Sequence, residues 1–205
     1  MTGRPLLPSF FSRTADQVAP ELLGAIIVSR AGRRSTSGRI IETEAYLGRV
    51  DPASHGYRLR RHARNEALYG PPGSWYVYLS YGVHWCINLV CGPPGEGQAV
   101  LIRALQPLDG ISVMRRRRAR RAVGDLCSGP GKLSQALGVT LDVNGVAMAE
   151  SRLTVHSGPG VPPAEIRFTP RVGITKAVDW PLRFILAKAA DPPRSRGRAV
   201  RSGAQ

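Results

Sequence analysis

Two glutamates stand inside an otherwise apolar stretch, RIIETEAY (39–46). Strand alternation predicts one face that carries four of its side chains, namely Ile40, Glu42, Glu44 and Tyr46. Glutamate is disfavoured in strands and is rarely buried without a partner. Arg103 also lies in an apolar stretch, AVLIRAL (99–105), and a charged side chain there needs an anionic partner. A salt bridge would explain both residues, and a carboxylate and an arginine facing a pocket could also hold a water molecule between them.

A second set of chemically useful side chains is aromatic. In a chain with only 6% aromatic residues, six fall between positions 69 and 85: Tyr69, Trp75, Tyr76, Tyr78, Tyr81 and Trp85. Alternation in WYVYLSY (75–81) predicts that Tyr76 and Tyr78 share one face, while the other face carries Trp75, Val77, Leu79 and Tyr81. Most of these aromatics are expected in the core. Tyr81 precedes the turn Gly82-Val83-His84 and is expected at a hairpin tip, where a planar side chain can wedge into a duplex or stack on an extruded base.

Arginine clusters dominate the net charge of +15. They lie in RLRRHAR (58–64), in RRRRARR (115–121) and in the segment 191–205, and they leave the rest of the chain nearly neutral. Clustered arginine on a balanced body is typical of a protein that binds phosphates. The alternative explanation is an arginine content inherited from a GC-rich genome, together with a solvated tail. An acidic membrane surface is less well supported, because no amphipathic anchor accompanies the charge.

Several other classes of protein do not fit the pattern. No apolar run is long enough to span a membrane, and the N-terminus does not resemble a signal peptide. The odd set of Cys86, Cys91 and Cys127 lacks CxxC spacing, which favours reduced thiols in a cytoplasmic protein. The histidines do not have metal-ligand spacing with these cysteines, and no P-loop is present, so neither a metal nor a cofactor is expected. In SGPGKLSQALG (128–138), Lys132 near a helix start could hold a DNA phosphate, or the glycines could simply form a turn.

The elements that must position these residues alternate between strands and helices. A capping box at Thr14–Gln17 predicts a helix over 15–23. Further helices are expected over 109–122 and 132–138, and strands over 25–30, 39–46, 75–81, 85–90, 99–105, 152–158 and 164–169. The segment 181–187 could form either. The pattern indicates an α+β fold with a mostly antiparallel sheet in one compact domain, 1–190, followed by a basic disordered tail, 191–205.

Read together, the motifs closely resemble those of the alkyladenine (3-methyladenine) DNA glycosylase family. The matching pieces are LLG (22–24), GRIIETEAYLGRVDPASH (38–55), ARN (63–65), GPPGSWYVYLSYGVHWCINLV (70–90), AVLIRALQPLDG (99–110), CSGPGKLSQALG (127–138) and PRVGI (170–174). The resemblance implies a curved antiparallel sheet with peripheral helices. It also implies a monofunctional, metal-free enzyme that acts as a monomer on damaged purines in double-stranded DNA and starts base excision repair. The expected location is the cytoplasm, in association with a bacterial-type nucleoid.

The resemblance also implies roles for individual residues. Glu44 would be the general base that activates water, Arg103 would hold that water and a nearby phosphate, and the backbone carbonyl of Val172 would be a further water partner. The flipped purine would lie among four pocket residues: Tyr46, Tyr78, His55 and Asn88, the last disfavouring the amine of undamaged guanine. Tyr81 would fill the gap in the duplex. The DNA backbone would contact Arg64 and Lys132, and part of the 115–121 run is expected to follow phosphates.

Other functions stay open at this point. The same scaffold could serve as a non-catalytic DNA- or RNA-binding module, and a ribosome-associated basic protein is a third possibility. Departures from the family pattern at RLRRH (58–62), Leu68-Tyr69 and Val83-His84 bear on lesion preference and duplex affinity. No lysine accompanies Glu44 in the strand motifs, so a Schiff-base lyase step is not expected.

Overall fold

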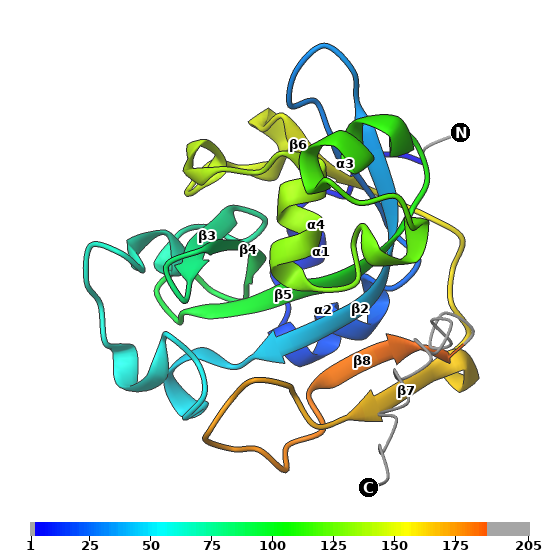
Figure 1. The fold of residues 1–205 in the computed structure, drawn as a ribbon. Coiled ribbons are helices and arrows are strands. Elements are labelled where there is room, and N and C mark those ends of the chain that lie inside the picture. The colour runs from blue at the N-terminus through cyan, green and yellow to red at the C-terminus, as the bar shows by residue number, and fades with distance from the viewer. Residues whose placement is uncertain (1–2, 188–205) are drawn as a thin grey trace, which may run out of the picture.

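A curled antiparallel sheet forms the centre of the computed structural model, which describes residues 3–187 (Figure 1). Its strands are β1 (Ile26–Ser29), β2 (Thr36–Tyr46), β3 (Trp75–Ser80), β4 (His84–Cys91), β5 (Gln98–Pro107), β6 (Leu153–His156), β7 (Ile166–Thr169) and β8 (Arg183–Leu186). The main order is β3-β4-β5-β2-β1-β6. The first part of β2 pairs with β1 and its second part pairs with β8, which in turn pairs with β7. The predicted α+β class with an antiparallel sheet in one compact domain is confirmed.

The helices are short and pack against the curled sheet (Figure 1). They are α1 (Pro8–Phe11), α2 (Ala15–Glu21), α3 (Ile111–Arg118) and α4 (Pro130–Leu137). Single 3-10 turns occupy Gly48–Val50, Tyr57–Leu59, Glu66–Tyr69, Val123–Asp125, Leu141–Val143, Met148–Glu150 and Pro163–Glu165. Helices α2 and α4 bury apolar side chains in the main core, among them Val18, Leu133 and Leu137.

Element boundaries differ from the expected ones in a few places. Thr14 is the N-cap of α2 as predicted, but its side chain makes no capping hydrogen bond. Helix α3 ends at Arg118, before the predicted 122, because Ala119 adopts a left-handed conformation (φ 48°) after four consecutive arginines whose charges repel one another. The segment 181–187 contains a strand, β8. The expected basic tail, 191–205, lies outside the described residues.

Side-chain alternation works as predicted in β3 and fails in part of β2. Trp75 and Val77 are buried in the main core, whereas Tyr76 and Tyr78 belong to a separate cluster on the other face. In β2 the pairing register shifts at two points, between Ile40 and Glu42 and between Glu42 and Thr43. A bulge changes which face the following side chains occupy. Ile40 therefore lies in the main core together with Ala45. The prediction that Ile40 shares a face with Glu44 and Tyr46 was wrong.

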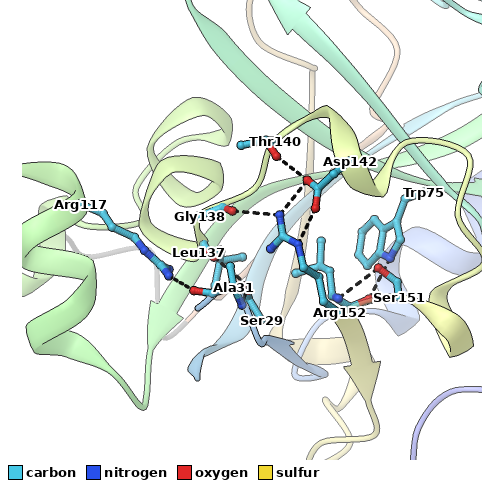
Figure 2. A network of polar contacts seen from close by, with 11 residues as sticks. Ser29, Ala31, Trp75, Arg117, Leu137, Gly138, Thr140, Asp142, Ser151 and Arg152 are labelled. Carbon is cyan, nitrogen blue, oxygen red and sulfur yellow. Dashed lines mark hydrogen bonds and ion pairs between the residues drawn. The ribbon is translucent and has the colours of Figure 1, made fainter. Parts of the chain in front are cut away.

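A polar network fastens the end of α4 to neighbouring strands (Figure 2). The Arg152 guanidinium binds the Asp142 carboxylate through Nε (2.6 Å to Oδ2) and Nη2 (2.8 Å to Oδ1). The same Nη2 donates to the carbonyl of Gly138 (3.2 Å), just beyond α4. The Ser29 hydroxyl of β1 donates to the carbonyl of Leu137 (2.7 Å). These bonds satisfy carbonyls at the C-terminal end of the helix, which would otherwise lack partners.

We expect Asp142→Asn to lower the melting temperature at pH 7 by a small amount. Hydrogen bonding by Arg152 holds the pKa of Asp142 at about 2, below its ordinary value of 3.8. A carboxyl group with a lowered pKa stabilises the fold at any pH above its ordinary pKa. That stabilisation is lost as the pH falls through the folded-state pKa. The carboxylate is half exposed, so the pair contributes no more than ~1 kcal/mol. Thermal unfolding of both proteins between pH 7 and pH 2 would test this. A melting difference that stays constant down to pH 2 would contradict the assignment.

Candidate functional site

A cavity of about 590 Å³ opens on the face of the sheet opposite the main core. Strands β3, β4 and β5 contribute its floor, and the segments 52–55 and 172–176 contribute its rim. The predicted site residues that line it are Tyr46, His55, Tyr78, Tyr81, Asn88, Arg103 and Val172. The fold thus brings together residues that are more than a hundred positions apart in the sequence.

Glu44 lies behind the cavity wall and has no exposed surface. The backbone N–H of Val172 donates to its Oε1 (2.8 Å), and the hydroxyl of Tyr46 donates to its Oε2 (2.9 Å). Arg103 Nη1 lies 3.4 Å from Oε1. Each of these three neighbours also forms part of the cavity wall, so two side chains and one backbone segment lie between the carboxylate and the cavity.

Burial dominates the ionisation of Glu44. It raises the pKa of the carboxyl group above its ordinary value, against the opposing influence of Arg103, of the Val172 N–H and of the Tyr46 hydroxyl. Nearby Glu42 raises the pKa further. A carboxyl group held in this way is more basic than an exposed one and accepts a proton more readily.

Arg103 joins the cavity to a network of partly buried charges. Its Nε donates to Glu42 Oε1 (2.9 Å), and Arg183 of β8 donates to the same oxygen (2.6 Å). The expected salt bridge of Arg103 is therefore present, and it involves both glutamates of β2. Arg103 still lines the cavity. The ion pair and a position at the pocket wall coexist.

Aromatic rings form one side of the cavity. The Tyr76 and Tyr78 rings are stacked, with centroids 5.6 Å apart, and the His55 ring meets Tyr78 edge-on at 4.6 Å. His55 Nδ1 lies 2.8 Å from the Tyr76 hydroxyl. Burial lowers the pKa of His55, with a smaller effect of His62, and this favours a neutral imidazole. Asn88 donates its amide to the carbonyl of Tyr76 (3.0 Å), which fixes the orientation of its side chain.

Tyr81 projects from the tip of the β3–β4 hairpin. It is 89% exposed and has a positive φ of 50°, an uncommon conformation for a residue other than glycine. Val83 beside it is also exposed. Leu79, on the same strand face as Trp75 and Val77, is exposed too, because this end of β3 extends past the core. An exposed aromatic ring on a strained tip contributes little to folding and is available for contact with a partner.

The two residues expected at the DNA backbone lie outside the cavity lining. Arg64 is exposed in the loop before β3. Lys132 is also outside the wall, in the first turn of α4, and donates to Ser128 Oγ (2.9 Å). Asn65, the residue after Arg64, is buried and donates to the carbonyls of His55 (3.1 Å) and Arg60 (2.8 Å). The sequence analysis did not predict that Asn65 binds these loop carbonyls. Its place in the ARN motif was the one signal that could have pointed to it.

The arginine run 115–121 divides into two groups. Arg117 is partly buried and donates to the carbonyls of Ala136 (3.0 Å) and Ala31, and Arg118 donates to the Gln135 side chain. These two arginines join α3 to neighbouring elements. The exposed members are Arg115, Arg116, Arg120 and Arg121. In this second group, Arg115 Nε donates to the carbonyl of Arg121 (2.9 Å) and Arg120 Nη1 to that of Ala119 (3.3 Å), both within the exposed segment itself.

Residues 3–187 contain neither a metal-type cluster nor a membrane-spanning helix. No three His, Cys, Asp or Glu side chains in this range gather as metal ligands would. No helix in the same range is long and apolar enough to cross a membrane.

We expect Glu44→Gln to leave the melting temperature at pH 7 unchanged or slightly higher. Because burial raises the folded-state pKa of Glu44, stability is lost as the pH rises from the ordinary value of 4.5 through the folded-state value, and the whole loss is present above it. Glutamine removes this charge, while Arg103 keeps Glu42 as its partner. Thermal unfolding at pH 5 and pH 8 would measure the difference, and Glu42→Gln provides the matched control. A large loss of stability in Glu44→Gln alone would contradict the interpretation.

Comparison with known proteins identifies the family of this chain. The profile of the methylpurine-DNA glycosylase (MPG) family matches residues 9–190. A relative from Rhodopseudomonas palustris strain HaA2, provisionally named a 3-methyladenine DNA glycosylase, is 48% identical over 182 residues, which cover 89% of this chain and 87% of the relative. A relative from Methanoculleus marisnigri, with the same provisional name, is 49% identical over 181 residues, covering 87% of this chain and 93% of its own. The chain therefore belongs to the methylpurine-DNA glycosylase family.

Proposed function

We propose that this protein is a monofunctional DNA glycosylase that removes alkylated or deaminated purines, such as 3-methyladenine, from double-stranded DNA. The observation that carries the proposal is the position of Glu44. Its carboxylate lies directly behind an aromatic cavity and is held by Arg103, the Val172 N–H and the Tyr46 hydroxyl. The names of the relatives support the same reaction.

Glu44 acts in this proposal as the general base. A water molecule that enters between Arg103 and Val172 gives its proton to the carboxylate as it attacks C1′ of the damaged nucleotide. The Val172 carbonyl belongs to the peptide after the one whose N–H binds Glu44, so it can contact the water while the N–H contact persists. The carboxylate also stabilises the positive charge that develops on the sugar as the base leaves.

The aromatic wall recognises the flipped purine. Tyr46 and Tyr78 stack on the base, His55 contacts it from the side, and Asn88 opposes the exocyclic amine of normal guanine. Alkylation at N3 or N7 makes a purine cationic, and a desolvated cation over a tyrosine face gains about 1–2 kcal/mol. Flipping costs less at damaged or mismatched pairs, so discrimination begins before the base reaches the cavity.

The exposed residues hold the duplex around this pocket. Tyr81 enters the space that the flipped nucleotide leaves, as an intercalating side chain on a hairpin tip. Arg64, Lys132 and the exposed arginines of the 115–121 run bind backbone phosphates. The protein acts as a monomer, because one lesion occupies one cavity.

The second candidate function is a non-catalytic DNA-binding module. One observation favours it: Glu44 has no exposed surface, so its carboxylate does not reach the cavity directly. Such a module would bind damaged duplexes without releasing a base. Activity measurements separate the two functions.

We expect Glu44→Gln to lower base release by about 10²–10⁴-fold, because glutamine keeps the shape of the side chain but does not accept the proton. Release would be measured as abasic sites formed in duplexes that contain methylated purines or hypoxanthine. The wild-type rate should fall at acidic pH as Glu44 becomes protonated, with a midpoint above its ordinary pKa of 4.5. Glu42→Gln removes a carboxylate from the same strand and should lose much less activity. Equal rates for wild type and Glu44→Gln would refute the role of Glu44, and lesion binding without any release would favour the binding module.

We expect the double variant Arg116→Ala/Arg121→Ala to weaken duplex binding and to reduce its dependence on salt. Each lost phosphate contact lowers the slope of log K against log [salt] by about 0.9 for B-form DNA, so two contacts lower it by about 1.8. Arg4→Ala/Arg167→Ala removes the same charge from exposed positions on other elements and is the matched control. If both double variants give the wild-type slope, the run does not contact DNA.

A further inference from the structure

Arg171 is fully buried and binds another fully buried charge. Its Nη1 and Nη2 contact the two carboxylate oxygens of Asp51 at 2.5 Å and 2.8 Å, and neither side chain has any exposed surface. Nη1 also donates to the carbonyl of Ala45 in β2 (2.9 Å). A buried ion pair gives a fold little net stability, because desolvation offsets the attraction between the charges. Its position beside the site is therefore the feature that calls for an explanation.

Asp51 organises the chain that leads from β2 into the cavity rim. Its Oδ2 accepts the N–H of Leu47 (3.1 Å) and its Oδ1 accepts the N–H of Ala53 (3.0 Å). The segment that follows, 52–55, lines the cavity and ends with His55. Arg171 thus ties this rim segment to the loop that carries Val172.

Arg171 also adjoins the two residues, Tyr46 and Val172, that donate hydrogen bonds to Glu44. Its guanidinium carbon lies 4.6 Å from the centroid of the Tyr46 ring, whose hydroxyl binds Oε2 of Glu44. The residue after it, Val172, supplies the N–H that binds Oε1. One donor for each carboxylate oxygen therefore depends on where Arg171 is held. Arg103 reaches Glu44 separately, from β5.

We propose that Arg171, fixed by Asp51, is a positioning residue that holds the Tyr46 hydroxyl and the Val172 N–H against the two oxygens of Glu44. It acts through these two neighbours, and it has no contact with Glu44 in the structure. The catalytic part of this inference rests on the proposed function, in which Glu44 is the general base. The positioning itself is a property of the fold and can be measured without turnover.

Loosening this arrangement has a specific effect on Glu44. The groups that face its carboxyl are Arg103 from β5, Glu42 from the same strand, the Tyr46 hydroxyl and the Val172 N–H, while Arg183 opposite it on β8 binds Glu42 instead. The two donors that Arg171 positions favour the ionised form, so their loss would raise the pKa of Glu44 further. Less base would then be ionised at a given pH, and its geometry would be poorer.

The test uses two variants of the whole protein. Arg171→Lys keeps the charge but loses the two-pronged contact with Asp51. Asp51→Asn/Arg171→Gln removes both charges together and leaves two amides that can hydrogen-bond, which avoids an unpaired buried charge if the single variant does not fold. Circular dichroism and thermal unfolding identify the folded variants, and all measurements are made well below their melting temperatures.

For each folded variant we expect single-turnover base release at pH 7 to fall roughly tenfold to a hundredfold, as displacements of about 1 Å at reacting groups do. Duplex affinity should stay close to that of wild type, because no predicted DNA contact changes. The acidic limb of the pH–rate profile should move to higher pH. A folded variant with the wild-type rate and an unmoved limb would overturn the proposal, because a merely structural pair would leave both unchanged.

A ¹³C NMR titration of the Glu44 carboxyl group in wild type and variants separates this inference from the proposed function. We expect a higher pKa in the variants whether or not the protein releases bases. An unchanged pKa in a folded variant would overturn the positioning role. If wild type released no base from any lesion, the proposed function would fail, and the titration would still decide the role of Arg171.

Discussion

Burial of the Glu44 carboxylate is the constraint on which the rest of the site depends. A buried carboxylate loses its hydration and requires hydrogen bonds and an opposite charge in return. These come from three parts of the chain: Tyr46 on the same strand, Arg103 on β5, and the backbone of Val172 in the loop before β8. Strands β2, β5 and the Val172 loop must therefore meet at one point. The sheet order, with β2 between β5 and β8, provides that meeting.

The same sheet supplies the core with one face and the cavity with the other. In β3 the alternation alone separates Trp75 and Val77 from Tyr76 and Tyr78. In β2 a strict alternation would place Ile40 on the cavity face beside the charges. The register shifts around Glu42 return Ile40 to the core and keep Glu42, Glu44 and their arginine on the other side. Two irregularities in the ladder thus permit a strand to serve an apolar core at one end and a charged site at the other.

Local patterns in the sequence predicted most of the helices and strands, but they missed the contacts between residues of different elements. Alternation and turn residues sufficed for the β3–β4 hairpin and for Tyr81 at its tip, since both depend on neighbouring residues. Bulges depend on cross-strand packing and left no local signal at Ile40. Asp51 and Arg171 are 120 positions apart, and no periodicity links residues at that separation. Both stand in motifs shared with the family, yet motif matching gave them no role, because their function is visible only through the contacts that they make with Tyr46 and Val172.

The arginines show why composition predicts less than position does. Arg117 and Arg171 belong to the same excess of positive charge as the exposed arginines, yet both donate to backbone carbonyls inside the fold. Guanidinium groups suit this role, since they present several donors in a fixed plane and remain charged when buried. Charge counted along the sequence therefore overstates the surface that is available to DNA. In the function proposed above, the exposed arginines supply long-range attraction to DNA, which tolerates imprecise placement, whereas buried Arg171 fixes distances near Glu44, where errors of an ångström would affect the rate. A single residue type thus supports two different functions, and burial distinguishes them.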